Sequence, residues 1–305
     1  MARSLFSGVS GMRAHQDKMD VIANNIANMN TYGYKSGRVT FKESLYQTTK
    51  ASSNGTDTYG GTNPSQVGYG SQVGTVDLMY STGAYSPTDS STDCMIDGNG
   101  FFVLGAKGGK VEVDSDPSVT SKHMESTVLS RVGNFEIDGD GYLVDGGGNV
   151  VYGYPDPKDT SYIQPLVVPY VDSSGNKVAA GTSGASPMKL NSISISSSGE
   201  LTGTDSNGKV VTVGAIAVAN VPNPNALEKT EGPYYTIREN TGDVEPQIPG
   251  EGTTGKLISN GLEMSNVDLA KEFSEMITTE RGFQANSKII TVSDEMLEDL
   301  VNLKR

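Results

Sequence analysis

Large apolar residues recur at helical spacing at both ends of the chain. Near the C-terminus a row of six is spaced seven residues apart, and near the N-terminus a row of four has the same spacing. The two rows are Leu262, Leu269, Met276, Phe283, Ile290 and Leu297, and Leu5, Met12, Met19 and Ile26. A seven-residue apolar repeat keeps one seam of a helix facing a partner in a left-handed coiled coil. The pattern therefore predicts α-helices within 1–45 and 262–305 that pair through these seams. Ser265 followed by Asp268 fits the capping box of a helix start.

The middle of the chain has the pattern of β structure. All 13 prolines lie between Pro64 and Pro249, and short apolar runs there are separated by turn signals. Residues 101–104 (FFVL) and 209–221 read as strands, and 134–144 reads as a hairpin that turns through Asp-Gly. The sequence thus predicts an α+β protein whose mainly β core, built of antiparallel sheets and hairpins, spans 46–155 and 189–261. We expect an extended linker near 46–70 and a small insertion or outer lobe over 156–188, which is rich in Pro, Ser and Gly.

The charges of the two ends have opposite signs. Segment 1–45 has six Lys and Arg against three Asp and Glu, and segment 262–305 has five against nine. Opposite charge favours pairing of the ends, although each exposed ion pair contributes only about 0–1 kcal/mol. A second interpretation fits the pattern as well: two ordinary amphipathic helices docked on a globular core.

Composition excludes several classes of function. The chain has 305 residues and a formal net charge of −13, so its bulk charge does not favour nucleic acid. Its apolar runs are too short to insert in a membrane, and the N-terminus lacks the apolar core of a cleaved secretory signal. The single cysteine, Cys94, allows no internal disulfide and is expected to be a small buried residue.

Candidate catalytic chemistry is sparse. Asp138-Gly-Asp140-Gly is similar to the start of a calcium loop, but the position that needs a bidentate Glu is Asn149. The two histidines, His15 and His123, have no nucleophile pattern beside them, and there is no phosphate loop, dinucleotide fingerprint or zinc motif. We therefore expect no enzyme activity, no catalytic or metal-binding residues and no cofactor.

Three segments resemble the axial proteins of the bacterial flagellum, the rod and hook family. They are residues 4–41, especially NNIANMNTYGYK from Asn24 to Lys35, the β-core stretches STDCMIDGNGFFVL and SRVGNFEIDGDGYLVDGGGNVVYGYP, and the C-terminal stretch from Gly261. The motif residues that carry the resemblance are Asn24, Asn25, Asn28, Asn30, Thr31, Gly33 and Tyr34. The resemblance is weakest over about 155–190.

Within the family, the chain is more similar to hook subunits than to distal-rod subunits. SGVSGMRAHQ and ERGFQANSKIITVSDEMLEDLVNLKR are hook-like, whereas distal-rod relatives usually have Arg-Ala-Tyr-Glu in place of Arg281-Gly-Phe-Gln284. The expected outer domain is smaller than in many hook proteins.

The resemblance implies a structural function: copies stack helically into the hook, a flexible joint that carries torque from rod to filament. The alternative is a distal rod protein of the basal body. The implied partners are other copies of the chain, rod and hook–filament junction proteins, and the hook cap and export apparatus during assembly. The implied location is the flagellum, outside the cell, after export by the flagellar type III system.

Overall fold

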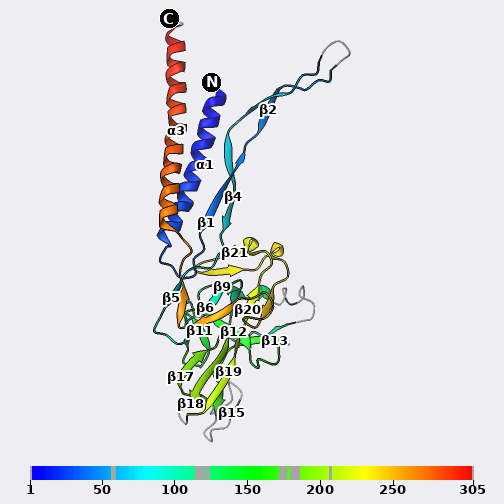
Figure 1. Ribbon diagram of the computed structural model, residues 1–305, viewed down its shortest axis with the longest axis vertical. Helices are drawn as coiled ribbons and strands as arrows, with labels where there is room; N and C mark the ends of the chain where they lie inside the picture. The colour runs from blue at the N-terminus through cyan, green and yellow to red at the C-terminus, as the bar shows by residue number, and fades with distance from the viewer. Residues whose placement is uncertain are drawn as a thin grey trace. The chain divides into compact units, whose positions relative to one another are not determined.

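Two helices and a β-ribbon form the first of the two units of the chain. The computed structural model describes residues 2–55, 60–113, 120, 124–171, 177–178, 186–205 and 208–303, so His123 lies outside the described residues. Unit 1 comprises Met1–Met29, Lys35–Met79 and Val267–Arg305, and unit 2 comprises Asn30–Tyr34 and Tyr80–Asn266. In unit 1, α1 (Ala2–Ala27) and α3 (Leu269–Asn302) lie side by side (Figure 1). The predicted pairing of the two terminal helices is confirmed.

Helix α3 starts later than predicted. Its N-cap is Asp268, whose Oδ1 accepts hydrogen bonds from the backbone N–H groups of Ala270 (2.9 Å) and Lys271 (3.3 Å). A side-chain oxygen at this position satisfies donors that have no partner inside the helix. Asp268 is thus the cap itself and not the third helical residue of a capping box that begins at Ser265.

The ribbon of unit 1 replaces the extended linker expected near 46–70. Its strands are β1 (Gly37–Glu43), β2 (Tyr46–Lys50), β3 (Ser65–Gly68) and β4 (Ser71–Leu78). β1 pairs antiparallel with β4, and β2 pairs antiparallel with β3. Backbone hydrogen bonds from Ser44 to Gly70 and from Tyr69 to Leu45 continue the ladder between the two pairs. The alternating Thr, Val and Tyr residues of this segment suit a strand.

Unit 2 is the predicted β region, and every strand pairing described in it is antiparallel. Its largest sheet has the path β17-β18-β19-β12-β7-β9-β22-β21, with β8, β10, β11, β13, β20 and β23 paired at its sides. The strands of this sheet are β7 (Phe101–Gly105), β8 (Val111–Glu112), β9 (Val128–Ser130), β10 (Phe135–Ile137), β11 (Leu143–Asp145), β12 (Val150–Tyr154), β13 (Tyr162–Pro165), β17 (Leu190–Ile195), β18 (Glu200–Asp205), β19 (Val210–Ile216), β20 (Val218–Asn220), β21 (Glu228–Lys229), β22 (Tyr234–Thr236) and β23 (Glu245–Gln247).

Smaller pairings complete unit 2. β24 (Lys256–Ser259) pairs with β6 (Cys94–Asp97), and β25 (Gly261–Glu263) pairs with β5 (Tyr85–Pro87). β14 (Tyr170–Val171) lies between β15 (Lys177–Val178) and β16 (Ser186–Pro187). Within the described part of this unit, 3₁₀ turns occur at Met124–Ser126, Pro224–Ala226 and Glu239–Thr241.

The core of unit 2 is built from side chains of the apolar strands that the sequence predicts. β7 and β12 are buried along their whole length, and the predicted hairpin forms from β10 and β11, with Ile137 opposite Leu143. The buried cluster contains Cys94, Ile96, Phe102, Leu104, Phe135, Leu143, Val151, Leu166, Ile195, Leu201, Val213, Ile216, Val218 and Leu257. The α+β class, with terminal helices and a mainly β middle, is confirmed.

Part of the expected insertion belongs to this core. Ile163 and Leu166 are fully buried, and β13 pairs with β12 and β8. The start of the outer lobe at 156 is therefore too early, because the chain remains in the core through Val168. Within the described residues, no helix combines the length and the apolar character needed to cross a membrane.

Candidate assembly surface of the helix pair

The two helices of unit 1 run antiparallel and approach closely at glycines. A Cβ on Gly11 would lie 2.9 Å from side-chain atoms of Asn286, and a Cβ on Gly282 would lie 2.6 Å from Cε1 of His15. Gly8 faces Asn286 and Ile290 in the same way. Because glycine has no Cβ, the backbones can come nearer to each other here than larger residues would permit.

On α3, small and polar side chains occupy the centre of this contact. Glu272, Thr279 and Ser293 are buried, and Asn286 lies between them, so the four form a row spaced seven residues apart. The predicted apolar row lies three residues before each of them. There Leu269, Met276, Phe283 and Ile290 are half-buried, while Leu297 is more exposed. The pair therefore has two heptad rows, of which the more buried is polar.

The predicted apolar row on α1 also lies beside the closest contact with α3 and not at its centre. Leu5, Met12, Met19 and Ile26 are half-buried, whereas Gly8, Gly11, Ala14, Ile22 and Asn25 are the buried positions of the helix. Leu262 is not part of any helical seam. It lies in β25, in unit 2, and is buried there. That position of the predicted C-terminal row is wrong because the helix starts only after Asp268.

Asn25 of the family motif fastens three elements of unit 1. Its Nδ2 donates to the carbonyl of Gly37 at the start of β1 (2.8 Å), and its Oδ1 accepts from the N–H of Gly37 (2.9 Å). Nδ2 also lies 3.2 Å from Oε2 of Glu272 on α3. The amide of Asn25 thus both donates a hydrogen bond to Gly37 and accepts one from it, as a neighbouring strand would. Together with the contact to Glu272, these bonds hold α1, α3 and β1 together.

The remaining motif residues end α1 and shape the turn that follows. Nδ2 of Asn28 donates to the backbone and side-chain oxygens of Asn24 (2.9 and 2.8 Å). Asn30 and Thr31 are exposed.

In unit 2, Gly33 has φ +66°, and a Cβ there would lie 2.8 Å from Val132. Its N–H donates to the Glu263 carbonyl at 2.8 Å, and buried Tyr34 has the Lys229 ammonium 4.8 Å from its ring centroid.

His15 is the titratable group nearest the centre of the helix pair. Burial, followed by the positive charge of Lys18, lowers the pKa of His15 from its ordinary value of 6.5. Its ring packs edge-on against Phe41 at 5.6 Å, and its Nδ1 has no hydrogen-bond partner among the described residues. Lys18 in turn pairs with Glu275 at 3.1 Å. The structure thus favours a neutral imidazole at this contact.

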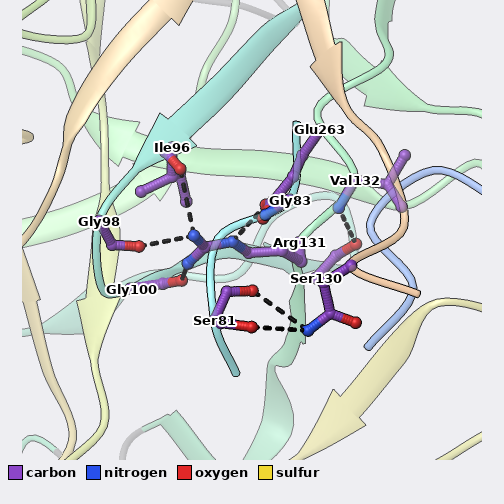
Figure 2. Close-up of polar contacts among 10 residues, drawn as sticks. Ser81, Gly83, Ile96, Gly98, Gly100, Ser130, Arg131, Val132 and Glu263 are labelled. Atoms are coloured by element: carbon purple, nitrogen blue, oxygen red, sulfur yellow. Dashed lines mark hydrogen bonds and ion pairs between the residues drawn. The ribbon is translucent and has the colours of Figure 1, made fainter. Parts of the chain in front are cut away.

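Figure 2 shows a buried ion pair in unit 2 that the sequence analysis did not identify. Nε of Arg131 donates to Oε2 of Glu263 at 2.7 Å, and the side chains are 4% and 0% exposed. The other guanidinium nitrogens donate to the carbonyls of Ile96, Gly98 and Gly100. The second carboxylate oxygen of Glu263 accepts the N–H of Gly83 at 2.7 Å. Since the two residues lie far apart in the sequence, no local pattern signals their pairing.

Helix α3 and its C-cap carry large apolar side chains that are exposed to solvent. Phe273, Ile277, Ile289, Val292, Met296, Leu300, Val301 and Leu303 are all exposed. A group of exposed large apolar side chains on one helix often marks an interaction site. We therefore take these exposed apolar residues of α3 as the candidate assembly surface.

Chemical sites are not evident in the same region or in unit 2. Among the described residues, no group of three or more His, Cys, Asp or Glu is placed to hold a metal ion. At the turn similar to a calcium loop, the Lys107 ammonium lies 2.7 Å from Asp138 and 2.9 Å from Asp140. Cys94 is fully buried, and burial raises the pKa of its thiol, which makes the reactive thiolate unfavourable.

Comparison with known proteins places both ends of the chain in flagellar families. Residues 5–35 match the family described as "Flagella basal body rod protein", and residues 258–303 match "Flagellar basal body rod FlgEFG protein C-terminal". The chain is 40% identical over 306 residues to the flagellar basal-body rod protein FlgG of Bacillus subtilis, with 100% of both chains covered. It is 30% identical to the FlgG of Caulobacter vibrioides, with 99% of each chain covered.

A relative with a hook name matches over the full length as well. The flagellar hook protein FlgE of Borreliella burgdorferi is 28% identical over 442 aligned positions, with 100% of both chains covered. The alignment is much longer than the 305 residues of this chain, which indicates additional residues in that hook protein.

Proposed function

The chain belongs to the flagellar rod and hook family, and from this premise we propose that it is the subunit of the flagellar hook. The family consists of structural proteins of the bacterial flagellum that form polymers of themselves with neighbouring flagellar components. In the proposed hook, copies stack helically into a curved tube that transmits torque from rod to filament. The proposal includes no enzyme activity.

The contact between His15 and Gly282 is the observation that supports the hook. His15 lies in one hook-like segment, SGVSGMRAHQ, and Gly282 lies in the other, ERGFQANSKII. An alanine at 282, as in the Arg-Ala-Tyr-Glu sequence usual in distal-rod relatives, would put its Cβ 2.6 Å from the His15 ring. The His15 of one hook-like segment therefore requires the glycine at 282 in the other.

The alternative is a subunit of the distal rod, and a different observation favours it. The relatives named as rod proteins align over about the length of this chain, 306 residues for the Bacillus subtilis protein, whereas the hook-named relative aligns over 442 positions. A straight rod and a curved hook can both be built from subunits with the same helix pair. The chain matches the rod-named relative in length and is more identical to it in sequence, so the distal rod is the second candidate.

Location of the protein within the flagellum tests the two candidates. A short affinity tag inserted after Gly108 should leave the fold intact, since a side chain at that glycine would meet no atom within 4 Å. Gold-labelled antibody on isolated flagella should then bind the curved segment outside the cell. Label confined to the straight segment between the envelope rings would overturn the hook and establish the rod.

Assembly partners follow from the proposed function. We expect the chain to contact rod subunits at one end of the tube and hook–filament junction proteins at the other, with a cap during growth. Export through the flagellum's own type III apparatus would deliver it. The same proposal includes the predicted seam residues other than Leu262, and an outer lobe that begins after Val168.

A further inference from the structure

The chain passes between its two units at four places. Unit 2 contains the short segment 30–34 and the long segment 80–266, so the crossings lie at 29/30, 34/35, 79/80 and 266/267. Load that travels along the covalent chain enters unit 2 at these crossings. The way in which unit 2 holds the residues beside them therefore decides how firmly the chain is attached there.

Glu263 holds the segments beside all four crossings. Its backbone carbonyl accepts a hydrogen bond from the N–H of Gly33, in segment 30–34, at 2.8 Å. Its carboxylate oxygen Oε1 accepts one from the N–H of Gly83, just after the crossing at 79/80, at 2.7 Å. Glu263 itself lies just before the crossing at 266/267. A single residue thus joins the three stretches of unit 2 through which the chain enters and leaves.

Further hydrogen bonds join two of these stretches next to Glu263. The N–H of Met264 donates to the carbonyl of Ala84 at 2.9 Å. Nδ2 of Asn266 donates to Oγ of Ser81 at 3.0 Å. The stretches that lead to the crossings at 79/80 and 266/267 are therefore held side by side until the chain leaves unit 2.

Arg131 fixes Glu263 to the β core, as Figure 2 shows. Its Nε donates to the carboxylate of Glu263 at 2.7 Å, and its other nitrogens donate to the carbonyls of Ile96, Gly98 and Gly100. These three carbonyls belong to β6 and to the turn that leads into β7, and β7 is buried along its whole length. Hydrogen bonds and an ion pair thus run from the four crossings into the core.

Stability alone does not account for this buried pair. Removing two charges from water costs about as much free energy as their attraction returns, and apolar residues of the same volume are often at least as stabilising. A polar network whose members satisfy one another instead holds them in one geometry. Such a network is suited to the place where the chain enters and leaves a unit.

We propose that Arg131 and Glu263 are a mechanical anchor, which holds the four chain connections of unit 1 on the core of unit 2 and carries load into it. This deepens the proposed function, on which it rests, because a subunit that transmits torque needs firm connections between its units. When the two ends of the chain are pulled apart, tension reaches segment 30–34 from the N-terminal side and 261–266 from the C-terminal side. The hydrogen bond between Gly33 and Glu263 joins these two segments and therefore resists their separation.

Pulling single full-length chains by their two ends tests the anchor. The helices should peel apart first. Release of Gly33 should then free residues 34–82 in a separate step of up to about 170 Å, because Gly83 still holds the other end of that stretch. Glu263→Gln has a single carbonyl oxygen beside its NH₂ group, so it cannot accept from both Arg131 and Gly83. We expect it to lower the mean force of this step at least about twofold.

A stability-matched variant separates anchoring from a general loss of stability. Leu201→Ala opens a cavity in β18, whose sheet partners are β17 and β19. It should lower the force at which the rest of unit 2 unfolds but not the force of the step. Arg131→Lys keeps the charge but not the fixed fork of donors, so it should weaken the step while unit 2 still folds. The proposal is overturned if the original chain shows no separate step, if the anchor variants leave its force unchanged, or if Leu201→Ala lowers it equally.

The result does not depend on the hook assignment, since it is measured on single chains. Absence of the step would refute the anchor even where gold label marks the hook. A step that Glu263→Gln weakens, and Leu201→Ala does not, would support the anchor even where the label marks the rod.

Discussion

Asn25 and Gly37 exchange two hydrogen bonds, one in each direction, between a helical side chain and the first residue of a strand. Asn25 is 1% exposed, so water cannot replace these bonds. We predict that Asn25→Ala destabilises unit 1 by about 1–3 kcal/mol, since it leaves the partly buried backbone groups of Gly37 and the buried carboxylate of Glu272 without this partner. Denaturant unfolding followed by helical circular dichroism measures the change. Asn30→Ala, at an exposed motif position, is the control and should stay within about 0.5 kcal/mol.

The packing of Gly282 against His15 predicts a specific overpacking defect. Gly282→Ala improves helix propensity by up to about 1 kcal/mol, but its Cβ would meet the imidazole. Overpacking typically costs about 1–3 kcal/mol, so we expect a net loss of helix-pair stability. Adding His15→Ser removes the imidazole, so the double variant should show the stabilisation expected from the higher helix propensity of alanine. A Gly282→Ala protein more stable than the original would show that the helices are not closely packed there.

The lowered pKa of His15 predicts that acid weakens the helix pair. Because the pKa of His15 is lower in the folded chain than its ordinary value of 6.5, the unfolded chain binds the proton more readily. The contribution of neutral His15 is complete well above pH 6.5 and decreases as the pH falls through 6.5 toward the folded pKa. Unfolding of the helices should therefore occur at lower denaturant at about pH 5.5 than at about pH 7.5. His15→Gln should remove this part of the difference, whereas His123→Gln should leave it.

The buried ion pair of Arg131 and Glu263 should be sensitive to the loss of one member. Arg131→Met leaves the Glu263 carboxylate buried without its charged partner, and such changes cost about 3–5 kcal/mol. Chemical unfolding of the β unit measures the loss. Arg238→Met breaks an ion pair with Glu228 whose side chains are 61% and 57% exposed, so it should cost less than about 1 kcal/mol. Equal effects of the two variants would contradict the burial of the first pair.

The corrected boundary of the outer lobe predicts opposite results for two deletions. Removal of 156–188 takes away Ile163 and Leu166 from the core, so we expect unit 2 to fail to fold. Removal of 172–185 should be tolerated, because Val171 and Ser186 are antiparallel partners that a two-residue Asn-Gly turn can join. Circular dichroism and thermal unfolding would compare the two proteins. An unfolded product from the shorter deletion would place the lobe inside the core.

The sequence predicted the elements of the helix pair better than its interface. Heptad spacing identified both helices because an apolar row such as Met276, Phe283 and Ile290 is visible at a fixed interval. The row of Thr279, Asn286 and Ser293 has the same interval, but polar residues at helical spacing normally indicate a solvated face. This row is buried because glycines of α1 lie opposite it. The contact is between residues far apart in the chain, so a local sequence pattern does not reveal it.

Other features depended on contacts that no local pattern contains. The sequence predicts an extended linker near 46–70, and the ribbon there escapes prediction because its pairing joins Tyr46 to Gly68 across a long segment of turn-forming residues. The burial of Leu166 could not be distinguished from an exposed Pro-rich loop, since its neighbours are prolines and valines. The hairpin at 135–145 was predictable because its turn and its apolar alternation lie within one short window.

The unequal lengths of α1 and α3 give the helix pair two chemically different ends. At one end α3 continues past α1, and the other end leads into the segments that connect to unit 2. A filament built from such blocks has a direction, so a subunit arriving at one terminus meets a different surface from one arriving at the other. Growth from a single terminus then needs no separate marker, because the mismatch of eight residues already distinguishes front from back.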